Sequence, residues 1–131
     1  MADTEMDIYE LIGNDRFAVE NGCRLVECGG GEAVVEVELE PRHLNGVGAV
    51  QGGLIFTLAD TAFAAAANAD GHQIVSLSST VNFLRAVRGG KLTARAVPVS
   101  RGRTTCCYDV LVTDGEGKPV AKVQCTGFSK N

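Results

Sequence analysis

Residues 43–68, HLNGVGAVQGGLIFTLADTAFAAAAN, decide the fold of this chain. The stretch opens with a glycine-rich turn, and the pair Gly52-Gly53 then leads into a run whose periodicity predicts a long helix. One face of that helix carries apolar residues at helical spacing: Leu54, Leu58, Ala62 and Ala65. The opposite face carries small and weakly polar residues: Thr57, Asp60, Thr61, Ala64 and Asn68. A solvent-facing stripe would carry Lys, Glu or Arg, so we expect one face of this helix to be covered by the chain's own sheet and the other face by a further structural element.

Asp60 is the one charged residue between Ala49 and Ala69. A carboxylate on a covered helix must find hydrogen-bond partners, shift its pKa or take part in chemistry. The pattern alone supports a structural aspartate and a functional one equally.

Before this stretch, the sequence predicts a helical segment over residues 1–22 and a hairpin. A first short helix is expected over Thr4–Ile12, with Thr4 as its cap, and a second over Asp15–Asn21. Strands 23–28 and 32–40 flank three glycines, and the second strand alternates valine or leucine with glutamate until Pro41 ends it. The helical segment carries no visible chemistry and is typical of a lid or packing layer.

Four further strands are expected after the helix, over residues 73–85, 91–99, 103–113 and 119–128. Short glycine-bearing connections join them, as in an antiparallel meander. The first of these strands is poor in charge, so we expect both of its faces to be covered. One antiparallel sheet with one long helix on one face is an α+β fold, and the length of 131 residues fits a single domain over residues 1–131.

Composition excludes several classes of function. The net charge of −4 argues against non-specific binding to nucleic acid. The acidic start predicts no signal peptide, and Gln51, Asp60 and Asn68 interrupt the apolar helix, so no membrane span is expected. The five cysteines lack C-x-x-C spacing and only two histidines are present, so we expect no metal site. We expect the cysteines to be small buried hydrophobic residues in a reducing cytoplasm.

The start of the long helix is a candidate site for developing negative charge. The N–H groups of Gly52 and Gly53 have no acceptor four residues earlier, and the helix dipole favours an oxyanion there. Glycine also lets a ligand approach closely. The alternative, that the glycines serve only a tight turn, is weakened by the carboxylate that follows on the same helix.

Geometry adds a constraint on these two groups. Gly52 and Asp60 are eight residues apart in the sequence, which is about 12 Å along one helix axis. A carboxylate and an oxyanion donor that serve one carbonyl must both come within about 3 Å of the reacting atoms. One helix cannot supply both, but an antiparallel copy across a two-fold axis could. The sequence therefore favours an obligate dimer with a shared site.

The pattern H-x-N-x-x-G-x-x-[H]-G-G followed by L-A-D-x-A resembles the hotdog-fold acyl-CoA thioesterases. The phrases LNG, GGLIFTLADTAFAAAAN and NFLRA are similar to the phenylacetate-degradation, PaaI-like branch, and the resemblance covers roughly residues 15–129. It implies a sheet wrapped around the central helix, and dimers joined through an extended sheet. It also implies tetramers built as dimers of dimers.

The resemblance also implies residue roles. Asp60 matches the catalytic carboxylate, as general base or nucleophile, and Gly52 matches the glycine whose N–H polarises the thioester carbonyl. Asn45 matches the family asparagine near the reacting group, and Ser76 is a weaker match to a serine that positions water in some relatives. The family has His where this chain has Gln51. Glutamine can donate and accept hydrogen bonds but carries no proton near neutral pH.

Substrate contacts are expected from Gly53 and from cationic side chains, because coenzyme A carries phosphates. Arg85 and Arg88 come at the end of strand 73–85, and Arg103 sits in a hairpin. For each arginine the alternative is an ordinary surface position.

The expected function is hydrolysis of acyl-CoA to a free carboxylic acid and CoA in the cytoplasm, without a metal or redox cofactor. One alternative is a non-catalytic acyl-CoA binding module, for which Gln51 is the reason. Another is a hotdog enoyl-thioester hydratase or dehydratase, which would need a histidine–carboxylate pair, although no histidine is near Asp60 in the sequence. Thiol release and enoyl-CoA hydration separate the three functions.

Overall fold

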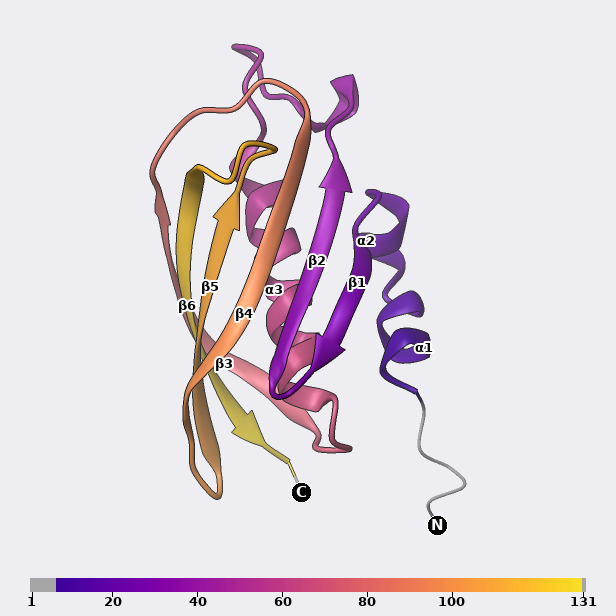
Figure 1. Cartoon of the computed structure of the whole chain (residues 1–131), viewed down its shortest axis with the longest axis vertical. Coiled ribbons are helices and arrows are strands. Elements are labelled where there is room, and N and C mark those ends of the chain that lie inside the picture. The colour runs from indigo at the N-terminus through magenta and orange to yellow at the C-terminus, as the bar shows by residue number, and fades with distance from the viewer. Residues whose placement is uncertain (1–6, 131) are drawn as a thin grey trace.

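The computed structural model describes residues 7–130 and contains a six-stranded antiparallel sheet with one long helix along its concave face (Figure 1). The strand order is β1-β2-β4-β5-β6-β3. The strands are β1 (Arg24–Gly29), β2 (Glu32–Glu38), β3 (Ile74–Phe83), β4 (Lys91–Arg101), β5 (Thr105–Thr113) and β6 (Pro119–Ser129). All neighbouring strands pair antiparallel, so the expected α+β architecture is confirmed.

The long helix is α3 (Gly52–Asn68), and it packs chiefly on β2 and β4. Its predicted apolar stripe is buried: Leu54, Leu58, Ala62 and Ala65. The Asn68 side chain closes the far end, since its Nδ2 donates to Ala64 O at 2.8 Å and its Oδ1 accepts from Ile74 N at 2.7 Å. The helix is thereby fixed both to the sheet and to the start of β3.

The inward face of the sheet supplies the rest of the core, because side chains alternate between the two faces of a strand. The residues of β4, β5 and β6 that face inward are fully buried: Leu92, Ala94, Ala96, Tyr108, Val110, Val112, Ala121, Val123 and Cys125. The adjacent cysteines in β5 point to opposite faces as expected, with Cys106 buried and Cys107 half-buried. Burial raises the pKa of the Cys23 thiol to about 11, which fits its predicted role as a small buried hydrophobe.

The prediction that both faces of residues 73–85 are covered is wrong within one chain. Strand β3 is an edge strand with β6 as its one neighbour, and most of its residues are exposed. Val75, Leu77 and Phe83 are among the exposed large hydrophobic side chains. Low charge in this strand therefore cannot be explained by burial against the chain's own core.

Two short helices cover the β1 side of α3 (Figure 1). Helix α1 (Ile8–Gly13) is capped by Asp7, so it begins later than predicted, and Thr4 lies outside the described residues. Helix α2 (Arg16–Glu20) is capped by Asp15, as the predicted start at that residue requires. Strand β2 ends at Glu38, and the 3₁₀ turn η2 (Pro41–His43) follows. None of the helices within residues 7–130 is long and apolar enough to cross a bilayer.

Gly127 in β6 provides a test of this packing. A Cβ atom at this position would come within 2.6 Å of Ile74 Cγ2, 2.9 Å of Phe63 Cζ and 3.1 Å of Cys106 Sγ. We therefore predict that Gly127→Ala lowers the free energy of unfolding by about 1–3 kcal/mol, the usual cost of overpacking a core. Denaturant unfolding measures this change.

The matched control is Gly115→Ala, because nothing lies within 4 Å of a Cβ at Gly115 and its φ is not in the left-handed region. Equal stability of Gly127→Ala and Gly115→Ala would contradict the described contact between β6, β3 and α3.

Candidate active site

The first turn of α3 leaves one backbone donor without an acceptor. Gln51 is the N-cap, and its Oε1 accepts from Gly53 N–H, while Leu54 N–H donates to Gln51 O at 3.0 Å. Gly52 N–H has no acceptor within the part of the chain that the structure describes. Because the helix dipole is positive at this end, Gly52 N–H is positioned to donate to a developing oxyanion.

Gly52 opens onto a cavity of about 460 Å³ whose lining includes Asn45, Phe83 and Arg85. A Cβ atom on Gly52 would stand 3.1 Å from Phe83 Cζ. Glycine at this position therefore keeps space open between the helix start and the end of β3. The structure brings together Asn45, Gly52 and Arg85, three of the predicted site residues.

Asn45 shapes the loop that precedes α3. Its Oδ1 accepts from Val47 N–H at 3.0 Å and from Ala49 N–H at 3.1 Å, and Asn45 N–H donates to Ala49 O at 2.7 Å. The side-chain oxygen is thus engaged by the loop itself. Any bond from this side chain to a substrate is expected to come from its Nδ2 group.

Asp60 lies on the outward face of α3 and is half-buried. Burial raises the pKa of its carboxyl group, the hydroxyl of Ser76 lowers this pKa, and the negative charge of Asp15 raises it. Ser76 Oγ donates to Asp60 Oδ1 at 3.4 Å. The structure thus places Ser76, the weaker of the predicted site matches, beside Asp60, a contact that the sequence did not predict. The net effect is a carboxyl group that binds its proton more tightly than an exposed aspartate does.

Asp60 does not share a cavity with Gly52 in one chain. It is absent from the lining of the Gly52 cavity and from the lining of the cavity on the other side of the helix start. The helix is regular from Gly52 to Asn68, so the separation of about 12 Å along its axis holds.

The predicted arginines differ in how far their charge is already neutralised. Arg85 forms an ion pair with Asp114 at 2.5 Å. Arg88 donates to Val47 O at 2.8 Å, in the loop that Asn45 shapes. Among residues 7–130, no carboxylate lies within ion-pair distance of Arg88 or of Arg103. Arg103 follows β4, whose eleven residues carry the chain away from Arg88, so one chain does not bring Arg103 to the Gly52 cavity.

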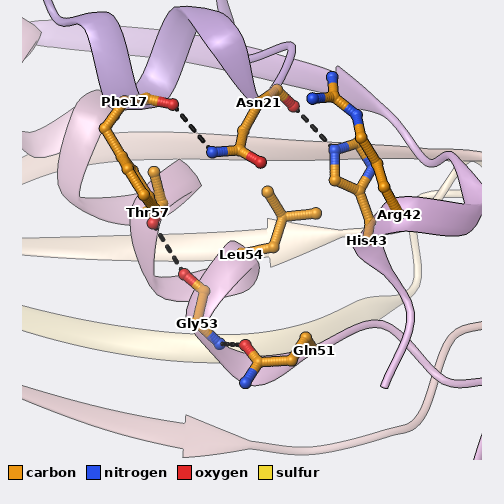
Figure 2. A pocket seen from close by; sticks show the side chains of 8 residues that line it. All are labelled: Phe17, Asn21, Arg42, His43, Gln51, Gly53, Leu54 and Thr57. Carbon is orange, nitrogen blue, oxygen red and sulfur yellow. Dashed lines mark hydrogen bonds between the residues drawn. The ribbon is translucent and has the colours of Figure 1, made fainter. Parts of the chain in front are cut away.

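A second cavity, of about 400 Å³, lies between α2, η2 and the first turn of α3 (Figure 2). His43 borders it, with Nδ1 accepting from Glu40 N–H at 2.9 Å and Nε2 2.9 Å from Asn21 O. These partners require the tautomer that donates from Nε2. His43 O also accepts from Gln51 N–H at 2.8 Å, so this histidine links α2 to the start of α3.

Sequence reasoning missed four residues that contact or influence α3: His43, Phe17 and Asn21 at the cavity by the helix start, and Asp15, whose charge acts on Asp60. It quoted His43 in the H-x-N pattern without a role, and it gave no role to Asp15, Phe17 or Asn21. The motif could have identified His43 as structurally fixed. The other three lie on a short helix whose approach to α3 depends on tertiary packing, for which the sequence holds no local signal.

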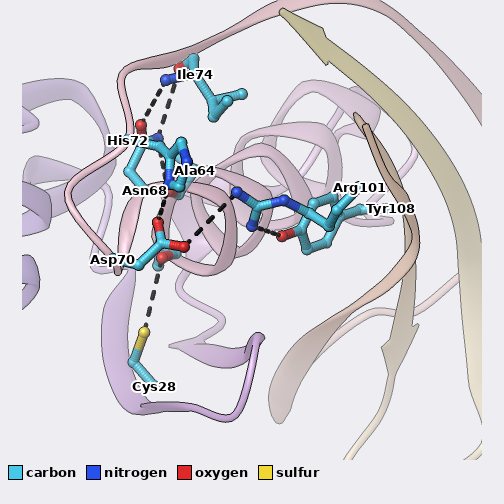
Figure 3. Close-up of polar contacts among 9 residues, drawn as sticks. Cys28, Ala64, Asn68, Asp70, His72, Ile74, Arg101 and Tyr108 are labelled. Atoms are coloured by element: carbon cyan, nitrogen blue, oxygen red, sulfur yellow. Dashed lines mark hydrogen bonds and ion pairs between the residues drawn. The ribbon is translucent and has the colours of Figure 1, made fainter. Parts of the chain in front are cut away.

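A polar cluster at the opposite end of α3 is satisfied by its own members (Figure 3). Asp70 pairs with His72 at 2.5 Å and lies 3.8 Å from Arg101, which donates to Tyr108 Oη at 2.6 Å. These contacts fix the α3–β3 turn to β4 and β5. No cluster of three or more His, Cys, Asp or Glu side chains able to hold a metal ion occurs among the residues described.

Comparison with known proteins identifies the family of this chain. A family model of the thioesterase superfamily matches residues 47–121. Acyl-coenzyme A thioesterase PaaI of Escherichia coli K12 is 38% identical over 114 residues, which cover 86% of this chain and 81% of PaaI.

Two solved structures extend the comparison to the fold. The E. coli PaaI protein from the phenylacetic acid degradation operon matches with a TM-score of 0.91 and 32% identity, over 95% of this chain and 91% of that one. A thioesterase of Streptococcus pneumoniae solved with coenzyme A matches with a TM-score of 0.86 and 30% identity, over 93% of this chain and 96% of that one. The chain therefore belongs to the thioesterase superfamily of thioester hydrolases, in its hotdog-fold, PaaI-like branch.

Proposed function

We propose that this chain hydrolyses acyl-CoA thioesters to a free carboxylic acid and CoA, at sites that two copies of the chain build together. The observation that carries the proposal is the pair of groups on α3. Gly52 N–H lacks an acceptor within residues 7–130, and Asp60 is a half-buried carboxylate with a raised pKa. The names of the E. coli and S. pneumoniae relatives support acyl-CoA as the substrate.

In this mechanism the thioester carbonyl oxygen accepts from Gly52 N–H of one chain. Asp60 of the second chain takes a proton from water, whose oxygen adds to the carbonyl carbon. The resulting oxyanion is stabilised by Gly52 N–H and by the helix dipole. When the intermediate collapses, the C–S bond breaks and the proton passes from Asp60 to the leaving thiolate, which gives CoA and the carboxylic acid.

Asp60 could alternatively attack the carbonyl carbon directly, and water would then hydrolyse the mixed anhydride. Both routes need the same two groups at one carbonyl, so both need the second chain.

The unpaired edge of β3 supports a dimer of this kind. Strand β3 has an unpaired edge in one chain and exposes Val75 and Leu77, and such an edge favours pairing with another strand. The outward stripe of α3 carries no charge apart from Asp60, which suits packing against an antiparallel copy. Arg88, which lacks a carboxylate partner among the described residues, is the arginine best placed to meet CoA phosphates near the Gly52 cavity.

Gln51 favours an active enzyme over a binding module. Its carboxamide oxygen caps Gly53 N–H, a role that needs no charge, so the absence of the family histidine leaves Gly52 N–H available. A hydratase is disfavoured because the ring nitrogens of His43 contact Glu40 N–H and Asn21 O instead of Asp60.

We predict that Asp60→Asn lowers the turnover of acyl-CoA by a factor of about 10²–10⁴, because the general base is lost. Release of free thiol from a panel of short, long and aromatic acyl-CoAs measures this change. Asp109→Asn, a half-buried aspartate on the outer face of β5, is the control and should keep wild-type turnover.

Asp60→Asn should be no less stable to unfolding than the wild type at pH 7. Asp60 has a raised pKa in the folded state, so its ionised form opposes folding once the pH exceeds the ordinary value of 3.8. Near wild-type turnover in folded Asp60→Asn would remove Asp60 from the mechanism.

We also predict that two neighbours of Asp60 shift the acid limb of the pH profile in opposite directions. The active form is the carboxylate, so kcat/KM should rise as the pH passes the pKa of Asp60. Asp15→Asn removes a negative charge and should move the limb to lower pH, while asparagine can still cap α2. Ser76→Ala removes a hydrogen bond to the carboxylate and should move the limb to higher pH.

Asp7→Asn is the matched control, because Asp7 caps α1 and is not among the causes of the Asp60 pKa shift. If Asp15→Asn and Ser76→Ala shifted the limb in the same direction, or left it in place, the acid limb would not report Asp60.

A further inference from the structure

The cavity between α2 and the start of α3 has an apolar wall that nothing in the chain's described core covers. Phe17 on α2 lines it and is 67% exposed, the largest exposure of any aromatic side chain among residues 7–130. Leu54 forms another part of the wall, and Figure 2 shows both side chains directed to the same space. The exposed ring of Phe17 therefore offers apolar surface to a ligand in this cavity.

The charged and polar groups around this cavity are already engaged. Arg42 donates to the Glu40 carboxylate at 3.0 Å and to Glu20 O at 2.7 Å. The ring nitrogens of His43 contact backbone groups, and Thr57 Oγ1 donates to Gly53 O at 2.8 Å. The cavity therefore offers no uncompensated cation to a phosphate group, and its chemistry suits an uncharged, largely apolar group.

The position of the cavity connects it to the reacting carbonyl. Gly53 and Gln51 line this cavity, whereas Gly52 lines the cavity that contains Asn45 and Arg85. Gly52 lies between Gln51 and Gly53 in the sequence, and consecutive Cα atoms are about 3.8 Å apart, so a carbonyl bound to Gly52 N–H is close to residues that line each cavity. The thioester has two substituents, and one leads to the phosphates of CoA. The Gly52 cavity, which Arg88 flanks through its contact with Val47 O, suits the CoA substituent. The Phe17 cavity is then left for the acyl substituent.

We propose that the acyl group of the substrate binds between Phe17 and Leu54, and that Phe17 determines which acyl groups are preferred. This inference rests on the proposed function. The volume of about 400 Å³ lies in the range of small-molecule sites. Acyl groups longer than acetyl offer more apolar surface to Phe17 and Leu54 than acetyl does, so they gain more from contact with this cavity.

The experiment compares hydrolysis of acetyl-, hexanoyl- and decanoyl-CoA by the wild type, Phe17→Ala, Phe17→Leu and Val19→Ala. Val19 lies on the same helix, is 42% exposed and does not line the cavity, so Val19→Ala is the matched control. For Phe17→Ala, the ratio of kcat/KM for hexanoyl-CoA to that for acetyl-CoA should fall by about tenfold or more, the usual effect of lost hydrophobic contact. Most of the fall should be in KM. Phe17→Leu should retain part of the preference.

Three results would overturn the inference. These are a wild-type ratio in Phe17→Ala, an equal loss for all acyl-CoAs, or the same change in Val19→Ala. Failure of the proposed function has a different signature, because the wild type would then release no thiol from any acyl-CoA.

In that case calorimetry with a hexanoyl-CoA thioether, which cannot be hydrolysed, tests the cavity directly. Binding that is at least tenfold weaker in Phe17→Ala than in Val19→Ala would support the acyl site, and equal binding would overturn it.

Discussion

The proposed site depends on the distance between two groups on one helix. Helix α3 presents Gly52 N–H at its first position and the Asp60 carboxylate two turns later, and a regular helix holds them about 12 Å apart. The sheet fixes this helix along its apolar stripe, so the two groups cannot approach each other by bending. A thioester carbonyl can therefore meet both only when a second α3 runs antiparallel beside the first. The exposed edge of β3 is consistent with that arrangement.

The N-cap of α3 decides which backbone donor is left for the substrate. The side-chain oxygen of Gln51 accepts from Gly53 N–H, and the backbone N–H of Gln51 donates to His43 O in η2. Gly52 N–H remains, and the absence of a side chain keeps the approach past Phe83 open. This cap needs no charge, because the carboxamide oxygen of Gln51 is enough to accept from Gly53 N–H. Neighbouring residues at the start of α3 line two cavities, one bordered by Arg85 and the other by Phe17.

The sequence predicts those features of the fold that depend on local periodicity. The long helix and the half-buried strand β2 were predicted because helical spacing and alternation report burial directly. The exposure of β3 could not be predicted, since low charge looks the same in a buried strand and in an edge strand that awaits a partner. At the site, Asp60 stood out as an isolated charge. Asp15 and Phe17 did not, because only the packing of α2 against α3 brings Asp15 close enough to act on Asp60 and Phe17 to the cavity at the helix start.

The most direct test of the shared site combines two inactive variants in one dimer. Asp60→Ala lacks the carboxylate and Gly52→Pro lacks the N–H, and proline is tolerated at a first helical position. Gly52→Ala, which adds a Cβ beside Phe83 but keeps the N–H, controls for crowding. Purified mixed dimers should contain one site with both groups and one with neither, and so recover up to about half of the wild-type turnover per dimer. If folded mixed dimers show no activity above either parent, the carboxylate and the donor do not act across two chains.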